Sequence, residues 1–189
     1  MKKIAVPLFA LAAATAFADS VTLGNSYNIW SKTEGLGTST SADIIFNADG
    51  GGLFIDIDNV KISSATVNSA GGNYFQVKTG YKATVSSLVF GTSKINVFKF
   101  GTGNEASKDG YLGEMDLIVG DTSVNTPIGF EVNSGTLNVI GAGGLSGMPF
   151  TVGNKGVLMS LLSALGIEQK YSLLGNPKTA LFVIVLMGV

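Results

Sequence analysis

The chain repeats the phrase Phe75-Gln76-Val77-Lys78-Thr79-Gly80, with variation, along the stretch from residue 44 to residue 144. The other copies are Ile55-Asp56-Ile57-Asp58-Asn59, Phe98-Lys99-Phe100-Gly101-Thr102-Gly103 and Phe130-Glu131-Val132-Asn133-Ser134-Gly135. Each copy opens on a large apolar residue, alternates polar with apolar positions, and closes on small or turn-forming residues. Their first residues are 20, 23 and 32 positions apart. A repeat of this length, made of short strands and tight turns, is typical of a stacked array of coils.

A second apolar feature recurs along the same stretch of the sequence. An earlier short strand in each repeat closes on Phe46, Val67 or Phe90. Each of these residues stands eight positions before a further aromatic residue, and these are Phe54, Phe75 and Phe98. Two features that recur with a fixed mutual spacing strengthen the prediction of a structural repeat.

The expected strands alternate β-branched or aromatic residues with polar ones, which indicates one buried face. Glycine, asparagine and aspartate supply the turns, because they accept positive φ at little cost. Stacked coils would pair each strand in parallel with its copies, about 4.8 Å away. We therefore predict an all-β fold, a right-handed parallel β-helix in which Phe75, Phe98 and Phe130 stack in one interior column. The alternative is an antiparallel β-sandwich or jelly roll, which also uses short strands.

The sequence divides into three expected segments. Residues 1–18 combine a basic start, an apolar run and small residues at the cleavage positions, which predicts a signal peptide cut after Ala18. Residues 19–153 would form the β-solenoid domain, with Trp30 plugging one end of its core. Residues 154–189 would form a C-terminal cap of helix and strand. Leucines at helical spacing predict a short helix over residues 157–165, a further helical turn follows within 167–174, and an apolar run predicts a strand over 181–187.

Composition excludes several classes of function. The chain contains no cysteine, histidine or arginine, so Ser-His-Asp and Cys-His nucleophile systems are excluded, as are zinc sites built on histidine or cysteine. Two of the 12 basic residues lie in the predicted signal peptide. The remainder carries 10 basic and 13 acidic residues, a formal charge of −3, which does not favour nucleic acid.

Two weaker signals concern carboxylates. Asp49, Asp56 and Asp58 flank a glycine turn and could bind calcium, but the pattern occurs once, so turn residues facing solvent are the preferred interpretation. A pair of carboxylates for glycoside hydrolysis could also be drawn from a larger set, Asp56, Asp58, Glu105, Asp109, Glu114 and Asp116. A cleft with Tyr74, Tyr81 and Tyr111 near such a pair would favour that chemistry. We predict no catalytic, cofactor-binding or metal-binding residues and no enzymatic activity.

The predicted signal peptide, the absence of cysteine and the short Gly/Ser/Thr/Asn-rich repeats resemble the passenger regions of Gram-negative autotransporters and related secreted exoproteins. The resemblance covers residues 21–153. It implies a parallel β-helix displayed on the cell surface, often as an adhesin. The chain departs from that pattern because it has no C-terminal translocator barrel of several hundred residues. Either it is a fragment or truncated relative, or it reaches the surface by another route.

The expected function is that of an exported, non-enzymatic structural or adhesive β-repeat protein. One alternative is a carbohydrate-binding or polysaccharide-active β-protein, and another is a fragment of a larger exoprotein of the autotransporter type. The expected location is the cell surface, the extracellular space or the periplasm, with outer-membrane association possible. The expected partners are a host or cell-surface glycan or protein. The mature chain is expected to have no cofactor and no transmembrane helix.

Overall fold

The computed structural model describes residues 20–91, 97–101, 111–119, 129–140, 149–163, 170–173 and 181–187. Within these ranges it describes the backbone alone for residues 119, 149, 150, 154, 155, 159–163, 170–173 and 181–187. Nearly all of the described chain is β-structure, with one short 3-10 helix near its start.

The strands range in length from 3 to 15 residues. The first elements are β1 (Ser20–Leu23), β2 (Tyr27–Ile29), the 3-10 helix η1 (Trp30–Lys32), β3 (Ser41–Phe46), β4 (Gly52–Ile55), β5 (Val60–Val67), β6 (Tyr74–Val77) and β7 (Lys82–Phe90). The later elements are β8 (Val97–Phe100), β9 (Glu114–Val119), β10 (Gly129–Ile140), β11 (Pro149–Ser163), β12 (Lys170–Leu173) and β13 (Leu181–Met187).

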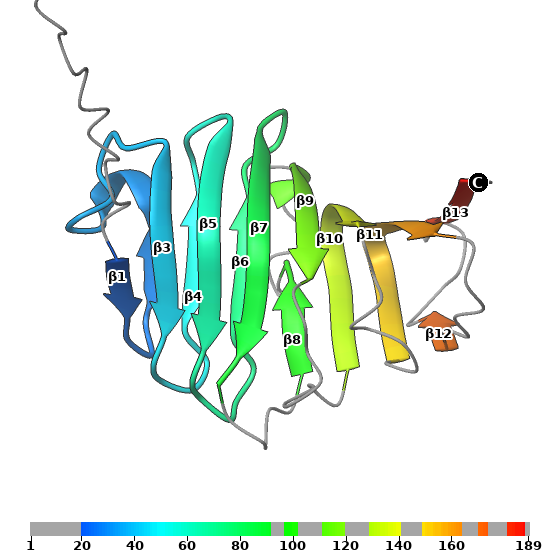
Figure 1. Cartoon of the computed structure of the whole chain (residues 1–189), viewed down its shortest axis with the longest axis horizontal. Helices are drawn as coiled ribbons and strands as arrows, with labels where there is room; N and C mark the ends of the chain where they lie inside the picture. The colour runs from blue at the N-terminus through cyan, green and yellow to red at the C-terminus, as the bar shows by residue number, and fades with distance from the viewer. Residues whose placement is uncertain are drawn as a thin grey trace, which may run out of the picture.

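All pairs of neighbouring strands run parallel, and they form two walls. The front wall in Figure 1 contains β1, β3, β5, β7 and β9, and the rear wall contains β2, β4, β6 and β8. The long strand β10 belongs to both walls, since its first half pairs with β8 and its second half with β9. Strand β11 continues both halves, and β12 and β13 pair with its two ends. The chain is a right-handed parallel β-helix, as predicted, and the antiparallel sandwich is excluded (Figure 1).

The spacing of register partners measures the length of each coil. Partners are 23 residues apart from β1 to β3, 20 or 21 from β3 to β5, and 23 from β5 to β7. From β7 to β9 the spacing rises to 32, as in Lys82 and Glu114, or 31, as in Leu88 and Val119. The extra residues lie between β8 and β9, so this coil is longer at one corner while the walls on both sides keep their pairing.

The interior is filled by the alternate residues that point inward from both walls. Phe98 lies at its centre, with its ring centroid 5.6 Å from that of Phe75 and 5.6 Å from that of Phe130. The predicted column of these three rings is therefore confirmed. Phe46 and Phe90 approach Phe98 from the front wall, at 6.0 Å and 6.1 Å.

The pairing register of the strands that carry these three rings differs from the spacing of the repeated phrase in the sequence. Phe130 pairs with Phe98, but Phe75 pairs with Phe100, two residues further along. A shift of two residues keeps every side chain on its own face, so the ring of Phe75 still reaches Phe98. Leu53, not Ile55 or Phe54, is the partner of Phe75 on the preceding coil.

The helix predicted for residues 157–165 is wrong. Residues 149–163 form the strand β11, which pairs with β10 on one side and with β13 on the other. Leu158 is buried in the core and Val157 is partly exposed, which is the alternation of a strand. A short apolar run fits both patterns, and the parallel edge that β10 offers decides for the strand. The helical turn expected within 167–174 is also wrong, because Lys170–Leu173 is strand β12, whereas the strand predicted at 181–187 is confirmed as β13.

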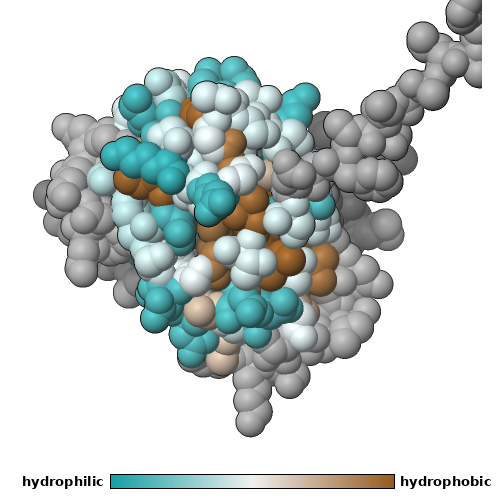
Figure 2. Space-filling view, turned by 90° about the vertical axis from the view of Figure 1, so that its left-hand side faces the viewer, coloured by the Kyte–Doolittle hydropathy of each residue, from teal (hydrophilic) through white to brown (hydrophobic). Residues whose placement is uncertain are grey.

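The first coil is closed by the segment that follows β2. Trp30 is fully buried, and its indole N–H donates a hydrogen bond to the carbonyl of Ser39 at 2.7 Å. Leu36, in the same segment, is also part of the core. The prediction that Trp30 plugs one end is confirmed. Figure 2, which looks at this end of the molecule, shows apolar surface in the middle with hydrophilic residues around it.

Candidate binding surfaces

The three aspartates considered as calcium ligands instead join neighbouring coils. A carboxylate oxygen of Asp49 accepts a hydrogen bond from the backbone N–H of Gly71 at 2.9 Å. Asp56 accepts from the backbone N–H and the hydroxyl of Ser31, and Asp58 accepts from the backbone N–H of Lys82. These aspartates therefore satisfy backbone donors at the turns, a role that the sequence did not indicate. The described residues include no group of three or more carboxylates placed to hold a metal ion.

Glu114 and Asp116, two of the predicted carboxylates, do lie together on the outer face of the front wall. The ammonium of Lys82 is 2.9 Å from a carboxylate oxygen of Glu114 and 3.0 Å from one of Asp116. The side-chain amide of Asn138 donates to both carboxylates at 2.7 Å. The side chains of Lys82 and Glu114 are 44% and 43% exposed, so this ionic cluster is open to water.

The ionic cluster has the features of a structural element that spans three strands. The Lys82 ammonium donates hydrogen bonds to Glu114 and Asp116. The bond to Glu114, and next the bond to Asp116, raises the pKa of Lys82 above its ordinary value. A hydrolytic pair needs one carboxylate to act as an acid and the other as a base or nucleophile across a bound sugar. Here a lysine bridges the two carboxylates, and an asparagine amide is hydrogen-bonded to both. We infer that the ionic cluster stabilises the pairing of β7, β9 and β10.

The Lys82→Met variant should lose about 1 kcal/mol of stability near neutral pH and low salt, because two carboxylates would then face each other without a cation. Since the folded pKa of Lys82 is raised, this contribution is present below the ordinary lysine pKa of about 10.4 and is lost as the pH rises through the folded value. Urea unfolding at neutral and strongly alkaline pH measures it. Lys61→Met is the control, since within the described ranges Lys61 forms no ion pair. An equal difference at both pH values would contradict the assignment.

Within the described ranges, the tyrosines that would favour glycoside hydrolysis do not gather with the paired carboxylates in one cleft. Tyr74 lies on β6 of the rear wall, whereas Glu114 and Asp116 lie on β9 of the front wall. Tyr81 packs partly against the core at the corner after β6, where the Lys78 ammonium is 4.5 Å from its ring centre. Of the other acids of the set, Asp56 and Asp58 accept hydrogen bonds at turns, and residues 105 and 109 lie outside the described ranges.

The outer face of the rear wall carries a group of aromatic rings, which we call the aromatic strip. Its members are Tyr27 on β2, Phe54 on β4, Tyr74 on β6 and Tyr111 just before β9. The rings of Tyr27 and Phe54 stack with centroids 6.2 Å apart and an angle of 17° between their planes. Tyr111 meets Phe54 edge-on at 5.1 Å. Tyr27 is 44% exposed, and the other three rings are partly exposed.

A glycine explains how Tyr74 lies in the aromatic strip. Gly52 is the register partner of Tyr27 on one side and of Tyr74 on the other. A Cβ atom at Gly52 would come within 2.0 Å of the Tyr74 ring, so the ring lies directly over the bare glycine backbone. Any larger residue at position 52 would force this ring away.

Sequence reasoning named Tyr74 and Tyr111 but missed Tyr27 and Phe54. The eight-residue spacing groups Phe54 with the interior residues Phe75 and Phe98, although strict alternation in Leu53-Phe54-Ile55 places it on the opposite face from its neighbours. Its outward position follows from that alternation alone. The contact between Phe54 and Tyr111 joins residues on different coils, and no local pattern indicates it.

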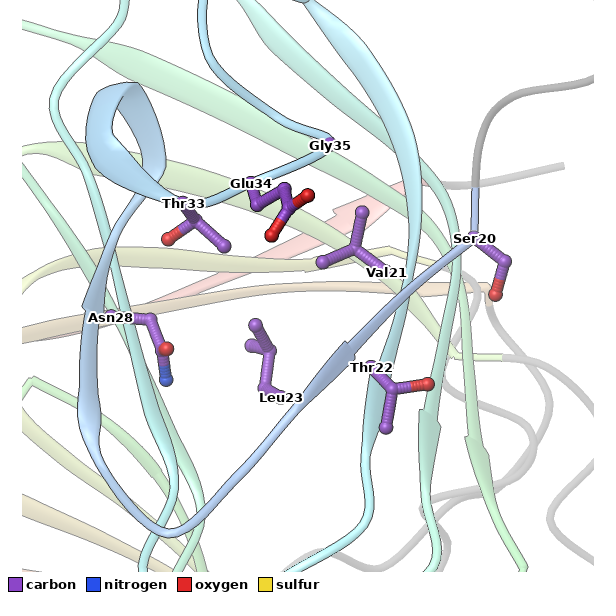
Figure 3. Close-up of a pocket in the computed structure, with 8 residues that line it drawn as sticks. All are labelled: Ser20, Val21, Thr22, Leu23, Asn28, Thr33, Glu34 and Gly35. Carbon is purple, nitrogen blue, oxygen red and sulfur yellow. The ribbon is translucent and has the colours of Figure 1, made fainter.

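A shallow hollow of about 500 Å³ lies at the N-terminal end of the described chain (Figure 3). Val21 and Leu23 of β1 point into it, and Glu34 approaches from the segment after η1. Its floor is the end of the hydrophobic core, since Val21 and Leu23 are both core residues. The hollow therefore lies at the end of the described solenoid, and Glu34 is the one titratable residue among the described residues that line it.

Comparison with family models, curated proteins and solved structures finds no match for this chain. The class of protein is therefore defined by its fold, a parallel β-solenoid. Within the ranges that the structure describes, no helix has the length and apolar character needed to cross a membrane.

Proposed function

We propose that this protein is an exported, non-enzymatic β-solenoid with a structural or adhesive role at the cell surface or outside the cell. The observation that carries the proposal is the repetition of outward positions along two walls. Each wall presents side chains in register on successive coils, as in the row of Thr22, Ile45, Thr66 and Val89. A surface of this kind can make many weak contacts with an extended partner, and their combined strength can far exceed that of any one.

The chemistry of the described outer faces supports binding over catalysis. The acids that approach one another are bridged by Lys82, and those at the turns accept backbone hydrogen bonds. Among the described residues, carboxylates bound in this way give no free acid and base facing a common cleft. The partner expected from the sequence, a glycan or a protein of a host or cell surface, remains the proposed partner.

Adhesion can be tested with beads coated with the full chain. Retention is measured on surfaces carrying neutral glycans, acidic glycans or extracellular matrix proteins, and the same polysaccharides are assayed for release of reducing ends. Retention on at least one surface without such release is the expected result. Retention on none of the surfaces, or steady release of reducing ends, would contradict an adhesive and non-enzymatic role.

Export can be tested through its cleavage site. Expression of the full chain in a Gram-negative host should give a mature protein that begins at Asp19, because Ala16 and Ala18 stand at the positions that a signal peptidase recognises. Replacing Ala18 with glutamine should leave most of the protein at full length and inside the cell. The mass of the intact protein in each cell fraction measures both results. An unprocessed wild-type chain in the cytoplasm would overturn the export proposal.

A further inference from the structure

The aromatic strip differs from the rest of the described surface in what it exposes. Large apolar side chains are mostly interior, and only Tyr27, Val89 and Ile118 are exposed in the parts of the chain described here. Val89 and Ile118 lie on the front wall. Tyr27 is the outermost member of a group of four rings that touch or share register partners on the rear wall.

The aromatic strip is long enough to contact more than one sugar ring. Tyr27, Phe54 and Tyr74 come from three successive coils, whose strands are about 4.8 Å apart, so the aromatic strip extends over roughly 10 Å. Three of the four rings are tyrosines, which offer an apolar face together with a hydroxyl able to donate and accept hydrogen bonds. Ligand sites commonly combine aromatic surface with a few such polar groups.

The charges beside the aromatic strip narrow the class of ligand. Lys99 follows Tyr74 in register on the next coil, but its ammonium is 3.3 Å from a carboxylate oxygen of Glu131. The adjoining positive charge is therefore already balanced, and the aromatic strip itself contains no charged residue. Among the described residues of the aromatic strip and its register partners, an anionic chain such as nucleic acid would find no excess of positive charge.

We propose that the aromatic strip of Tyr27, Phe54, Tyr74 and Tyr111 is a binding surface for the uncharged sugar rings of a polysaccharide. The apolar face of each sugar ring would lie against an aromatic ring, and its hydroxyls would face water and the polar residues beside the aromatic strip. This proposal rests on the proposed adhesive function, to which it assigns a class of partner.

The four rings of the aromatic strip could have a structural role instead of a binding role. Tyr74 covers the bare backbone of Gly52, and Tyr27 and Tyr111 pack on Phe54, so the rings could serve only to shield the rear wall. Shielding predicts that removing a ring changes stability without affecting any ligand. Binding predicts a change in affinity that does not follow the change in stability.

The test uses the full chain in native gels that contain a neutral β-glucan, dextran or chitin oligosaccharides, with polygalacturonate as the anionic comparison. Retardation by at least one neutral probe is expected, with little dependence on salt. Tyr27→Ala and Gly52→Ala should each weaken it roughly tenfold, the first by removing a ring and the second by displacing Tyr74. Ile118→Ala, which removes a similarly exposed apolar residue from the front wall, should bind as the wild type does. Urea unfolding of each variant shows whether the fold is retained.

Three results would overturn the proposal. They are no retardation by any neutral probe, binding of polygalacturonate alone, and equal binding by wild type, Tyr27→Ala and Gly52→Ala. The bead experiment separates this failure from failure of the adhesive role. Beads that still adhere to protein or acidic surfaces would leave adhesion standing without the aromatic strip, whereas beads that adhere to nothing would remove both.

Discussion

Replacing Phe98 with alanine is expected to lower the free energy of unfolding by about 3 to 5 kcal/mol. The ring is 2% exposed and contacts four others, with centroid distances between 5.6 Å and 6.1 Å. Alanine would leave a cavity that rigid strands on both walls cannot close. Because whole domains are stable by only about 5 to 15 kcal/mol, one substitution would remove a large part of the total.

Urea unfolding followed by far-UV circular dichroism and by the fluorescence of Trp30 measures this loss. The two signals report on different parts of the molecule, because Trp30 lies in the first coil and the circular dichroism reports all coils. Coinciding transitions would justify a two-state analysis, and separate ones would show that coils unfold in turn. Val89→Ala is the control and should change stability by less than about 0.5 kcal/mol. A loss below about 1 kcal/mol for Phe98→Ala would contradict the central place given to this ring.

Replacing Gly135 with alanine should destabilise the protein by about 3 kcal/mol. Gly135 has a φ of +77° in the corner of β10, and a Cβ atom there would lie 2.5 Å from the carbonyl oxygen of Gly113 on the preceding coil. The left-handed conformation accounts for about 1 to 2 kcal/mol, and the contact with rigid backbone adds a similar amount. The neighbouring hydrogen bond, from the N–H of Thr136 to the same carbonyl at 2.9 Å, would be strained as well.

Gly80 provides a matched control for this substitution. Its φ is +80°, but a Cβ atom there would meet nothing within 4 Å. Gly80→Ala should therefore show the conformational effect alone, about 1 kcal/mol. The difference between the two variants in urea unfolding isolates the contact between coils. Equal losses would mean that the close approach at Gly135 relaxes without a measurable effect.

Much of the fold could be predicted because the repeat is expressed in buried aromatic residues. Phe75, Phe98 and Phe130 stand at comparable points of their coils, and burial forces them onto one axis. Phe46, Val67 and Phe90 are consecutive register partners, as their spacing indicated. The interior of a solenoid is selected for apolar side chains, so its pattern is visible in the sequence.

The other features of the fold and of the aromatic strip depend on contacts between distant residues, which local sequence patterns do not predict. The apolar run that starts at Val157 is compatible with a helix and with a strand. Only its pairing with β10 decides for the strand. The two-residue shift between Phe75 and Phe100 leaves the faces unchanged, so alternation gives no sign of it. In the aromatic strip, Tyr27 and Tyr74 are brought together by Gly52, whose importance lies in the side chain that it lacks.

The long coil between β7 and β9 shows that this architecture can accept additional residues without adding another coil. Its register spacing of 31 or 32 leaves the strands of both walls paired, because the added residues fall between β8 and β9 in the sequence. Each doubling of such a corner loop raises the entropic penalty of closing it by only about 0.6 kcal/mol. A single residue inserted within a wall would instead turn inward-facing side chains outward. Corners are thus the places where the protein can accept a grafted epitope or a new recognition segment while its ladder of strands stays intact.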